Sequence, residues 1–222
     1  MIPYQKINSI YKRDLKGKFT SEYSTPEIEF LADKSWVWTE KIDGTNIRIG
    51  WNGNRVEFGG RTDNAQLPTF LYEHLSNVFT SESMIEKLKT NFATVNEDTK
   101  VVLYGEGYGR KIQGCGSRYI SNGVNFILFD IRVGHVWLTR DAVNDLAHTL
   151  DLSLVPTIGS GTLAQAEELV RSGFKSPTAE DSSLEAEGLV LRPGLDLLTR
   201  MGNRIITKIK TVDYRRENVK KE

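Results

Sequence analysis

The amino-acid sequence predicts an α+β fold in which mostly antiparallel sheets are flanked by helices. Two observations support this fold class. Short stretches in which apolar and polar residues alternate recur from Ser35 onward and are bounded by turn-forming dipeptides. Between them lie stretches whose apolar residues repeat at helical spacing and whose ends carry capping residues. Because we find no internal repeat, low-complexity tract or linker, we expect a single domain over residues 1–222.

The first strands are expected in a β-meander, whereas the stretch before Lys34 gives only weak structural signals. Asp43-Gly44 and Asn52-Gly53 are typical of tight hairpin turns, and each lies between alternating segments. We therefore expect three consecutive antiparallel strands. These segments are residues 36–42, 46–51 and 55–58.

Helices and further strands alternate in the remainder of the chain. Pro68 suits the first turn of a helical segment, within which Ser83 and Glu86 resemble a capping box that opens a second helix. Thr162 and Gln165 form another such box. The expected helical segments are residues 68–92, 140–150 and 164–172. The expected strands are residues 100–106, 125–133, 186–192 and 204–212.

The composition is that of an ordinary globular protein, with 39% apolar and 26% charged residues. No apolar run approaches the roughly 20 residues that cross a bilayer, and the N-terminus lacks the apolar core of a signal peptide. We therefore expect no membrane partner. The single cysteine, Cys115, excludes an internal disulfide framework and favours a reducing cytoplasm.

The formal net charge is zero, which argues against a strongly basic protein that binds nucleic acid nonspecifically. A local basic face is still compatible with it. Arg110, Lys111 and Arg118 lie close together in the sequence and are candidates for contact with a nucleic-acid backbone. The basic tail from Lys208 to Glu222 is a further candidate, although a solvated terminus is the simpler interpretation.

The segment Glu40-Lys-Ile-Asp-Gly44 contains a candidate nucleophile, Lys41. The motif alone is weak evidence, because Asp-Gly between strands is first of all a turn. A nucleophilic lysine must lose its proton, so it needs nearby positive charge or a metal to lower its pKa from about 10.4. To act on a nucleoside triphosphate it also needs cations for the phosphates, carboxylates for a divalent metal and an aromatic face for the base.

Lys208 and Lys210 provide the expected positive charge. They are one residue apart, so alternation along a strand places both on one face. Two such lysines repel each other unless an anion lies between them, which favours a phosphate site. They are also the expected source of a lowered Lys41 pKa.

Five segments resemble, in order, the motifs of the covalent nucleotidyltransferase superfamily, which contains the ATP-dependent ligases and the capping enzymes. The segments are Lys41-Ile-Asp43-Gly44, Leu103-Tyr-Gly-Glu106-Gly107, Phe126-Ile-Leu-Phe129-Asp130, Glu187-Gly188-Leu-Val190 and Lys208-Ile-Lys210. Each fragment is common by itself, but five in the right order agree as independent signals. The resemblance implies an ATP-grasp-like nucleotidyltransferase (adenylation) domain in which Lys41 becomes adenylylated.

Two further positions resemble one branch of this superfamily. DNA ligases and capping enzymes usually place arginine five residues after the nucleophile, where this chain has Asn46. The combination of Asn46 and Arg61 resembles the residue pattern of the branch that contains phage RNA ligase 2 and the kinetoplastid RNA-editing ligases. The resemblance implies an ATP-dependent RNA ligase in which AMP passes from Lys41 to a 5′-phosphate of RNA and a 3′-hydroxyl then displaces it. ATP is the implied AMP donor, and Mg²⁺ or Mn²⁺ the implied metal.

The resemblance also implies roles for individual residues. The expected catalytic residues are Lys41, Lys208 and Lys210. The expected nucleotide-binding residues are Glu40, Asn46, Arg61, Glu106, Phe129, Glu187, Lys208 and Lys210. The expected metal-associated acids are Asp43, Glu106, Asp130 and Glu187. Alternatives stay open, since Phe129 could equally be a core residue and Asp43 could only shape its turn.

The chain departs from the family pattern after the last lysine motif. Phage RNA ligases of this branch carry an additional C-terminal domain there, and DNA ligases and capping enzymes carry an OB-fold. Because twelve residues follow Lys210, we expect neither an OB-fold nor an additional C-terminal domain. RNA ends or a nicked duplex are the expected substrates, and a separate protein that supplies a nucleic-acid-binding domain is a candidate partner.

Four alternatives to this function remain open at the level of the sequence. They are a DNA ligase-like nick sealer, a capping guanylyltransferase, an adenylyltransferase that modifies another protein, and a nucleotide-binding module that does not seal unaided. A phage-encoded RNA repair enzyme in the host cytoplasm is the expected setting.

Overall fold

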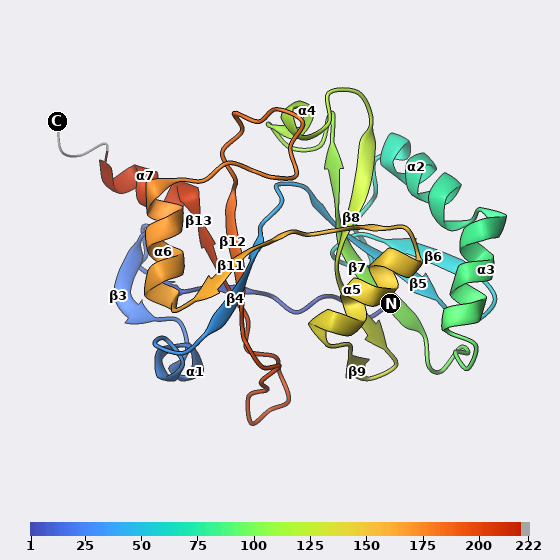
Figure 1. Cartoon of the computed structure of the whole chain (residues 1–222), viewed down its shortest axis with the longest axis horizontal. Helices are drawn as coiled ribbons and strands as arrows, with labels where there is room; N and C mark the ends of the chain where they lie inside the picture. Colours follow the sequence, from blue (N-terminus) through green and yellow to red (C-terminus); the bar gives the residue numbers. More distant parts are fainter. Residues whose placement is uncertain (219–222) are drawn as a thin grey trace. The chain divides into compact units, whose positions relative to one another are not determined.

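The computed structural model describes residues 1–218, with side chains described through Arg215. The chain forms two compact units, each with its own sheet and its own core (Figure 1). Unit 1 consists of Met1–Gln5 and Asp43–Val155, and unit 2 of Lys6–Ile42 and Pro156–Glu222. Both units combine a mostly antiparallel sheet with helices, which confirms the predicted fold class. No helix of the described residues is long and apolar enough to cross a membrane.

A six-stranded sheet forms the centre of unit 1. Its strand order is β10-β8-β7-β5-β6, with β9 paired to β8; β10 runs parallel to β8 and the other pairs are antiparallel. The strands are β5 (Thr45–Trp51), β6 (Val56–Gly59), β7 (Val101–Gly109), β8 (Val124–Val133), β9 (Val136–Trp137) and β10 (Ser153–Leu154). β5 and β6 form the hairpin that Asn52-Gly53 predicts.

The two faces of this sheet differ because side chains alternate along each strand. One face carries apolar residues such as Ile47 and Leu103, which pack against three helices. The opposite face carries Arg48, Tyr104 and Asp130, all fully buried. The helices of unit 1 are α2 (Thr69–Phe79), α3 (Glu82–Asn91), α4 (Gly116–Tyr119) and α5 (Arg140–Thr149); α4 is a single turn that follows β7.

Unit 2 is built on a five-stranded sheet with the order β1-β13-β12-β4-β11. Trp36 and Trp38 of β4 pack with Leu163, Ala166 and Val170 of α6 to form its core. The strands are β1 (Asn8–Ser9), β4 (Trp36–Glu40), β11 (Thr157–Gly161), β12 (Gly188–Pro193) and β13 (Thr207–Lys210). The remaining elements are the hairpin β2 (Tyr11–Arg13) and β3 (Phe19–Tyr23), and the helices α1 (Pro26–Phe30), α6 (Leu163–Ser172) and α7 (Thr211–Asn218).

The predicted meander is wrong at its first turn. β4 pairs with β11 and β12, whereas β5 pairs with β6 and β7, so Asp43-Gly44 links two sheets and closes no hairpin. The turn signal is local, but the pairing partners of a strand depend on which core its side chains enter. Trp36 of β4 belongs to the core of unit 2, and Ile47 of β5 belongs to that of unit 1.

The predicted capping box at Ser83 and Glu86 is also wrong. α3 begins two residues earlier, and Ser81 is its N-cap, with a side-chain oxygen that accepts the Met84 N–H. Both serines lie at the right distance from the apolar pattern, and only Ser81 has the extended backbone that a cap requires.

The remaining elements follow the sequence in part. The box formed by Thr162 and Gln165 at the start of α6 is confirmed. The strand expected over residues 204–212 ends at Lys210, where α7 begins. Two helices were not expected, α4 of four residues and α7 of eight residues. The other elements that were not expected have two to five residues each, too few for periodicity to reveal them. They are β1, β2, β3, α1, β9, β10 and β11.

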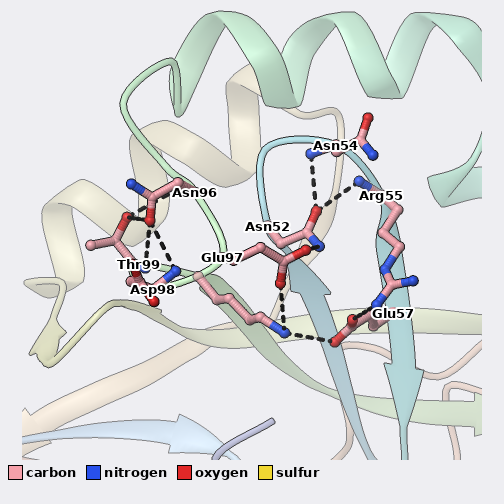
Figure 2. A network of polar contacts seen from close by, with 9 residues as sticks. Asn52, Asn54, Arg55, Glu57, Asn96, Glu97, Asp98 and Thr99 are labelled. Carbon is pink, nitrogen blue, oxygen red and sulfur yellow. Dashed lines mark hydrogen bonds and ion pairs between the residues drawn. The ribbon is translucent and has the colours of Figure 1, made fainter.

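A polar network ties the β5–β6 turn to the loop before β7 (Figure 2). Asn52 is 4% exposed, and its Oδ1 accepts the main-chain N–H groups of Asn54 and Arg55. Its Nδ2 donates to Glu97 at 2.6 Å. Glu97 lies 3.5 Å from the ammonium of Lys100, at the start of β7. The buried side-chain amide of Asn52 therefore forms hydrogen bonds with both the turn and the neighbouring loop.

We expect Asn52→Ala to lower the free energy of unfolding by about 2 kcal/mol, because it leaves two turn N–H groups and a carboxylate without their partner. Urea denaturation followed by circular dichroism measures this loss. Asn54→Ala is the matched control, since the Asn54 side chain is exposed and points away from the network (Figure 2), and it should change stability by less than about 0.5 kcal/mol. Equal stability of both variants would show that the network contributes nothing.

Candidate active site

The start of β12 lies between the ends of its two neighbours in unit 2. Because β12 is antiparallel to both β4 and β13, Glu187 lies beside Lys41 on one side and Lys210 on the other. The main-chain N–H of Lys41 donates to Gly188 at 2.9 Å. The N–H of Thr211 donates to the carbonyl of Glu187 at 2.9 Å. The sheet topology thus gathers three charged residues from distant parts of the sequence.

The carboxylate of Glu187 bridges the two lysines. Its Oε2 lies 2.6 Å from Lys41 Nζ, and its Oε1 lies 2.6 Å from Lys210 Nζ. The side chains of Glu187, Lys41 and Lys210 are 17%, 22% and 33% exposed, so water screens the cluster only partly. The carboxylate partly neutralises the two ammonium groups, and the cluster of Lys41, Glu187 and Lys210 carries a net positive charge.

Lys208 and Lys210 share one face of β13, as their spacing predicts, since Thr207 and Ile209 are buried on the other. Gly188 allows β12 to lie close to this strand. A Cβ at Gly188 would lie 2.0 Å from the carbonyl oxygen of Ile209, and its φ of +151° disfavours side chains. The glycine next to Glu187 is therefore a packing requirement.

Glu40 precedes Lys41 and points to the other face of the sheet, where it is 2% exposed. Thr178 Oγ1 donates to Glu40 Oε2 at 2.5 Å. Burial raises the pKa of Glu40, and the hydroxyls of Ser176 and Thr178 act in the opposite direction. Glu40 Oε1 is buried and has no hydrogen-bond partner within residues 1–218. One carboxylate oxygen is thus fixed by Thr178.

In unit 1, Asn46 of β5 and Glu106 of β7 are direct cross-strand partners, so their side chains lie on one face of the sheet. Glu106 is half-buried in an otherwise buried strand. Asn46 Oδ1 is buried, and no described residue donates to it. This pair therefore presents polar atoms on the face that the helices leave uncovered.

The Asp43-Gly44 turn in unit 1 is held by the segment that follows β7. Gln113 Nε2 donates to the carbonyl of Gly44 at 3.0 Å, and Cys115 Sγ donates to Asp43 Oδ2 at 3.1 Å. The Asp43 N–H donates to the hydroxyl oxygen of Tyr119 at 3.4 Å. Gln113 itself has a φ of 55°, an uncommon conformation for a residue with a side chain. Three side chains from one segment therefore fix the turn.

Phe129 and Asp130 lie at an irregularity of β8. Tyr104 pairs with Asp130 and Gly105 pairs with Leu128, so Phe129 is an extra residue in the strand, a β-bulge. Asp130 is fully buried and accepts a hydrogen bond from Tyr4. Phe129 is partly exposed.

The other predicted residues lie on the surface. Arg61 is exposed, and so are the three candidates for nucleic-acid contact, Arg110, Lys111 and Arg118, in the segment after β7. Arg110 donates to Asn122 at 3.4 Å. The end of the basic tail lies outside the described residues. Among those described, no three His, Cys, Asp or Glu side chains gather closely enough to hold a metal ion by themselves.

Comparison with known proteins identifies the family. Residues 34–210 match the protein family described as RNA ligase. The chain belongs to the RNA ligase family. No curated protein matches the chain.

Solved structures of the Naegleria gruberi RNA ligase share the fold. A lysine-to-alanine variant with ATP and manganese is 19% identical, with a TM-score of 0.63 over 97% of this chain and 63% of that one. The same ligase with pyrophosphate is 20% identical, with a TM-score of 0.63 over 97% of this chain and 64% of that one. A lysine-to-methionine variant with AMP and manganese is 19% identical, with a TM-score of 0.62 over 95% and 62%. This chain therefore spans less than two thirds of the length of these ligases.

Several residues that contact the motif residues were not predicted from the RNA ligase motifs. Thr178, Gln113, Tyr119 and Tyr4 lie outside the motifs and reach motif residues only through tertiary contacts. Cys115 entered the sequence analysis only as a single cysteine that excludes an internal disulfide framework, and its bond to Asp43 has no sequence signal. The glycine-rich composition of residues 107–116 was the one available indication of an unusual backbone there.

We expect Gly44→Ala to lower the stability of this RNA ligase family member by about 1–3 kcal/mol. An added Cβ would lie 2.4 Å from the Gly107 carbonyl oxygen and 2.7 Å from Glu106 Cγ, and the backbone oxygen cannot easily move away. Gly114→Ala is the control in the same unit, because nothing lies within 4 Å of its added Cβ. Thermal unfolding of both variants tests the prediction, which fails if Gly44→Ala unfolds at the wild-type temperature.

Proposed function

We propose that this chain is an ATP-dependent RNA ligase with Lys41 as its nucleophile. The carboxylate of Glu187 between the ammonium groups of Lys41 and Lys210 carries the proposal, because it places a lysine inside a positively charged, partly buried cluster. Membership of the RNA ligase family supports the reaction class. The Naegleria ligase structures with ATP, AMP and pyrophosphate support the choice of nucleotide.

The proposed reaction has three steps. Lys41 Nζ attacks the α-phosphorus of ATP, so that a P–N bond forms, the bond to pyrophosphate breaks and the amine loses its proton. The 5′-phosphate of RNA then attacks the same phosphorus, which releases Lys41 and forms a phosphoanhydride with AMP. Finally, a 3′-hydroxyl attacks the RNA phosphate, forming the phosphodiester and releasing AMP.

Glu187 controls the availability of Lys41 in this scheme. While Lys41 is an ammonium that donates to Glu187, its nitrogen has no free lone pair with which to attack phosphorus. The phosphates of ATP offer competing anionic oxygens, and Lys208 and Lys210 are proposed to bind them. Glu187 is then free to contact the nucleotide, as the family resemblance implies.

Other nucleotide contacts are proposed residue by residue from the same resemblance. Glu40 reads the amino edge of adenine through the carboxylate oxygen that lacks a partner. Asn46, Arg61 and Glu106 contact the sugar or the phosphates. Phe129 stacks on the base, as aromatic side chains commonly do.

A divalent metal that keeps part of its water shell is proposed from the same resemblance. The described residues include no complete cage of protein ligands, and magnesium is typically bound by one or two carboxylates together with waters and substrate phosphates. Asp43, Glu106 and Glu187 are the proposed contacts. Asp130 was also predicted, but its burial and its bond to Tyr4 favour an indirect role. The bound metal would neutralise phosphate charge and orient the triphosphate.

We further propose that the substrate is an RNA end or a nicked duplex. Asn46 and Arg61 favour the branch of phage RNA ligase 2 and the kinetoplastid editing ligases over DNA ligases. We also propose that a partner protein supplies a nucleic-acid-binding domain. The chain itself is proposed to be a single adenylation domain that acts in the cytoplasm as part of phage RNA repair.

Incubation with α-labelled ATP and Mg²⁺ tests the reaction directly. We expect acid-labile, alkali-stable, hydroxylamine-sensitive label on the wild-type chain, none on Lys41→Ala, and none after chelation of the metal. Lys34→Ala replaces an exposed lysine of the same unit and should label normally. Label from GTP in preference to ATP would indicate a capping enzyme. No label on protein stripped of bound AMP would refute catalysis by this chain.

RNA binding is tested through the exposed arginines. We expect Arg110→Ala and Arg118→Ala to weaken RNA binding, and each lost phosphate contact to reduce the slope of log K against log salt by about 0.7. Lysyl-AMP formation should not change, because neither residue is proposed to contact ATP. Arg55→Ala removes an exposed arginine of the same unit and serves as the control. Wild-type affinity and salt slope in both variants would exclude this surface.

A further inference from the structure

The first residues of the chain cover the polar face of the unit 1 sheet. Arg48 Nη1 donates to the carbonyl of Met1 at 2.6 Å, and Tyr104 donates from its hydroxyl to the carbonyl of Ile2 at 2.9 Å. Arg48 is fully buried, and its other donors bond to the Gly60 carbonyl and to a carboxylate. These bonds anchor the segment, and they determine where Tyr4 lies.

Tyr4 touches both residues of the Phe129-Asp130 motif. Its hydroxyl donates to Asp130 Oδ2 at 2.7 Å. Its ring lies edge-on to Phe129, with 5.0 Å between ring centroids. Tyr104 and Trp137 surround the same ring at 5.2 Å and 5.6 Å. Tyr4 is therefore held in an aromatic cluster while it contacts the motif.

The β-bulge makes these contacts important for Phe129. In a regular strand the ladder fixes the direction of each side chain, but an extra residue has no partner opposite it. The direction of Phe129 therefore depends on its side-chain contacts and on how firmly Asp130 is held. Tyr4 supplies a contact to both.

We propose that Tyr4 is a positioning residue for the nucleotide base, which holds Phe129 in the orientation that stacks on adenine. This inference rests on the proposed role of Phe129 in the ligase reaction. Tyr4 acts through Phe129 and Asp130 and does not itself contact the nucleotide. Bulges next to functional sites commonly re-aim a side chain, and here the N-terminal segment locks the re-aimed ring.

The proposal predicts a particular kinetic signature. Stacking on an aromatic face depends little on which purine is bound, whereas hydrogen bonds to the base edge distinguish purines. Loss of Tyr4 should therefore raise KM for ATP and for inosine triphosphate by the same factor. The maximal rate of lysyl-nucleotide formation should stay within about twofold, because the bound triphosphate still reaches Lys41.

The test compares Tyr4→Phe, Tyr4→Leu and Phe129→Ala in the full chain, with lysyl-AMP formation measured over a range of ATP concentrations. We expect Phe129→Ala and Tyr4→Leu to raise KM by about tenfold, the size of one lost base stack. Tyr4→Phe keeps the ring and loses only the bond to Asp130, so its KM should rise less. Tyr11→Phe is the matched control, because Tyr11 also donates to a carboxylate, Glu167, at 2.9 Å, in unit 2.

The outcomes separate the proposals. A wild-type KM in Tyr4→Leu, or an equal rise in Tyr11→Phe, would overturn the role of Tyr4. A wild-type KM in Phe129→Ala would show that Phe129 does not stack, and it would overturn the inference while lysyl-AMP on Lys41 left the ligase proposal standing. Should wild type form no lysyl-AMP, the ligase proposal fails, and equilibrium binding of ATP to the same variants still decides whether Tyr4 affects the nucleotide.

Discussion

The bridging carboxylate of Glu187 is the interaction on which the unit 2 cluster depends. Lys41 directly follows β4 and Lys210 ends β13, and these two strands flank the start of β12, so the sheet itself brings their ammonium groups toward one place. Like charges so close in a partly buried site repel strongly. Glu187 lies 2.6 Å from each ammonium and compensates this repulsion. The pairing of β12 with β4 and β13 therefore brings the two lysines together and also places Glu187 between them.

The candidate site residues differ in whether their side-chain oxygen atoms already have hydrogen-bond partners. Glu187 uses both carboxylate oxygens within the protein, whereas Glu40 and Asn46 each keep a buried oxygen for which no described residue is a donor. A buried acceptor without a donor costs folding free energy, typically about 1–3 kcal/mol. A hydrogen-bond donor of the substrate would offset this cost at both oxygens, in keeping with the proposed nucleotide contacts of Glu40 and Asn46. Glu187, by contrast, must release a lysine before one of its oxygens can contact a substrate.

The sequence predicts those parts of the structure that depend on short distances along the chain. Apolar periodicity located α2, α3, α5 and α6, and the capping box at Thr162 was correct because a cap depends on a few neighbouring residues. The β4–β5 hairpin failed because pairing depends on which core a strand enters, and Asp43-Gly44 gives the same turn signal in either case. Motif order indicated that Lys41, Glu187 and Lys210 belong together, and the topology explains why. Thr178 and Tyr4 could not be predicted, because each reaches its partner over more than a hundred residues.

The polar face of the unit 1 sheet carries two neighbouring rows of side chains. Arg48, Tyr104 and Asp130 occupy one row across β5, β7 and β8, and Asn46 and Glu106 belong to the next. The N-terminal segment bonds to the first row through main-chain carbonyls and through Tyr4. A buried guanidinium is tolerated only when its donors are satisfied, so this cover is needed for the sheet to keep Arg48 inside. The bulge at Phe129 lies where the two rows meet. The N-terminal segment therefore contacts both the Phe129 ring and the buried Arg48, so the position of the ring and the burial of the guanidinium depend on one segment.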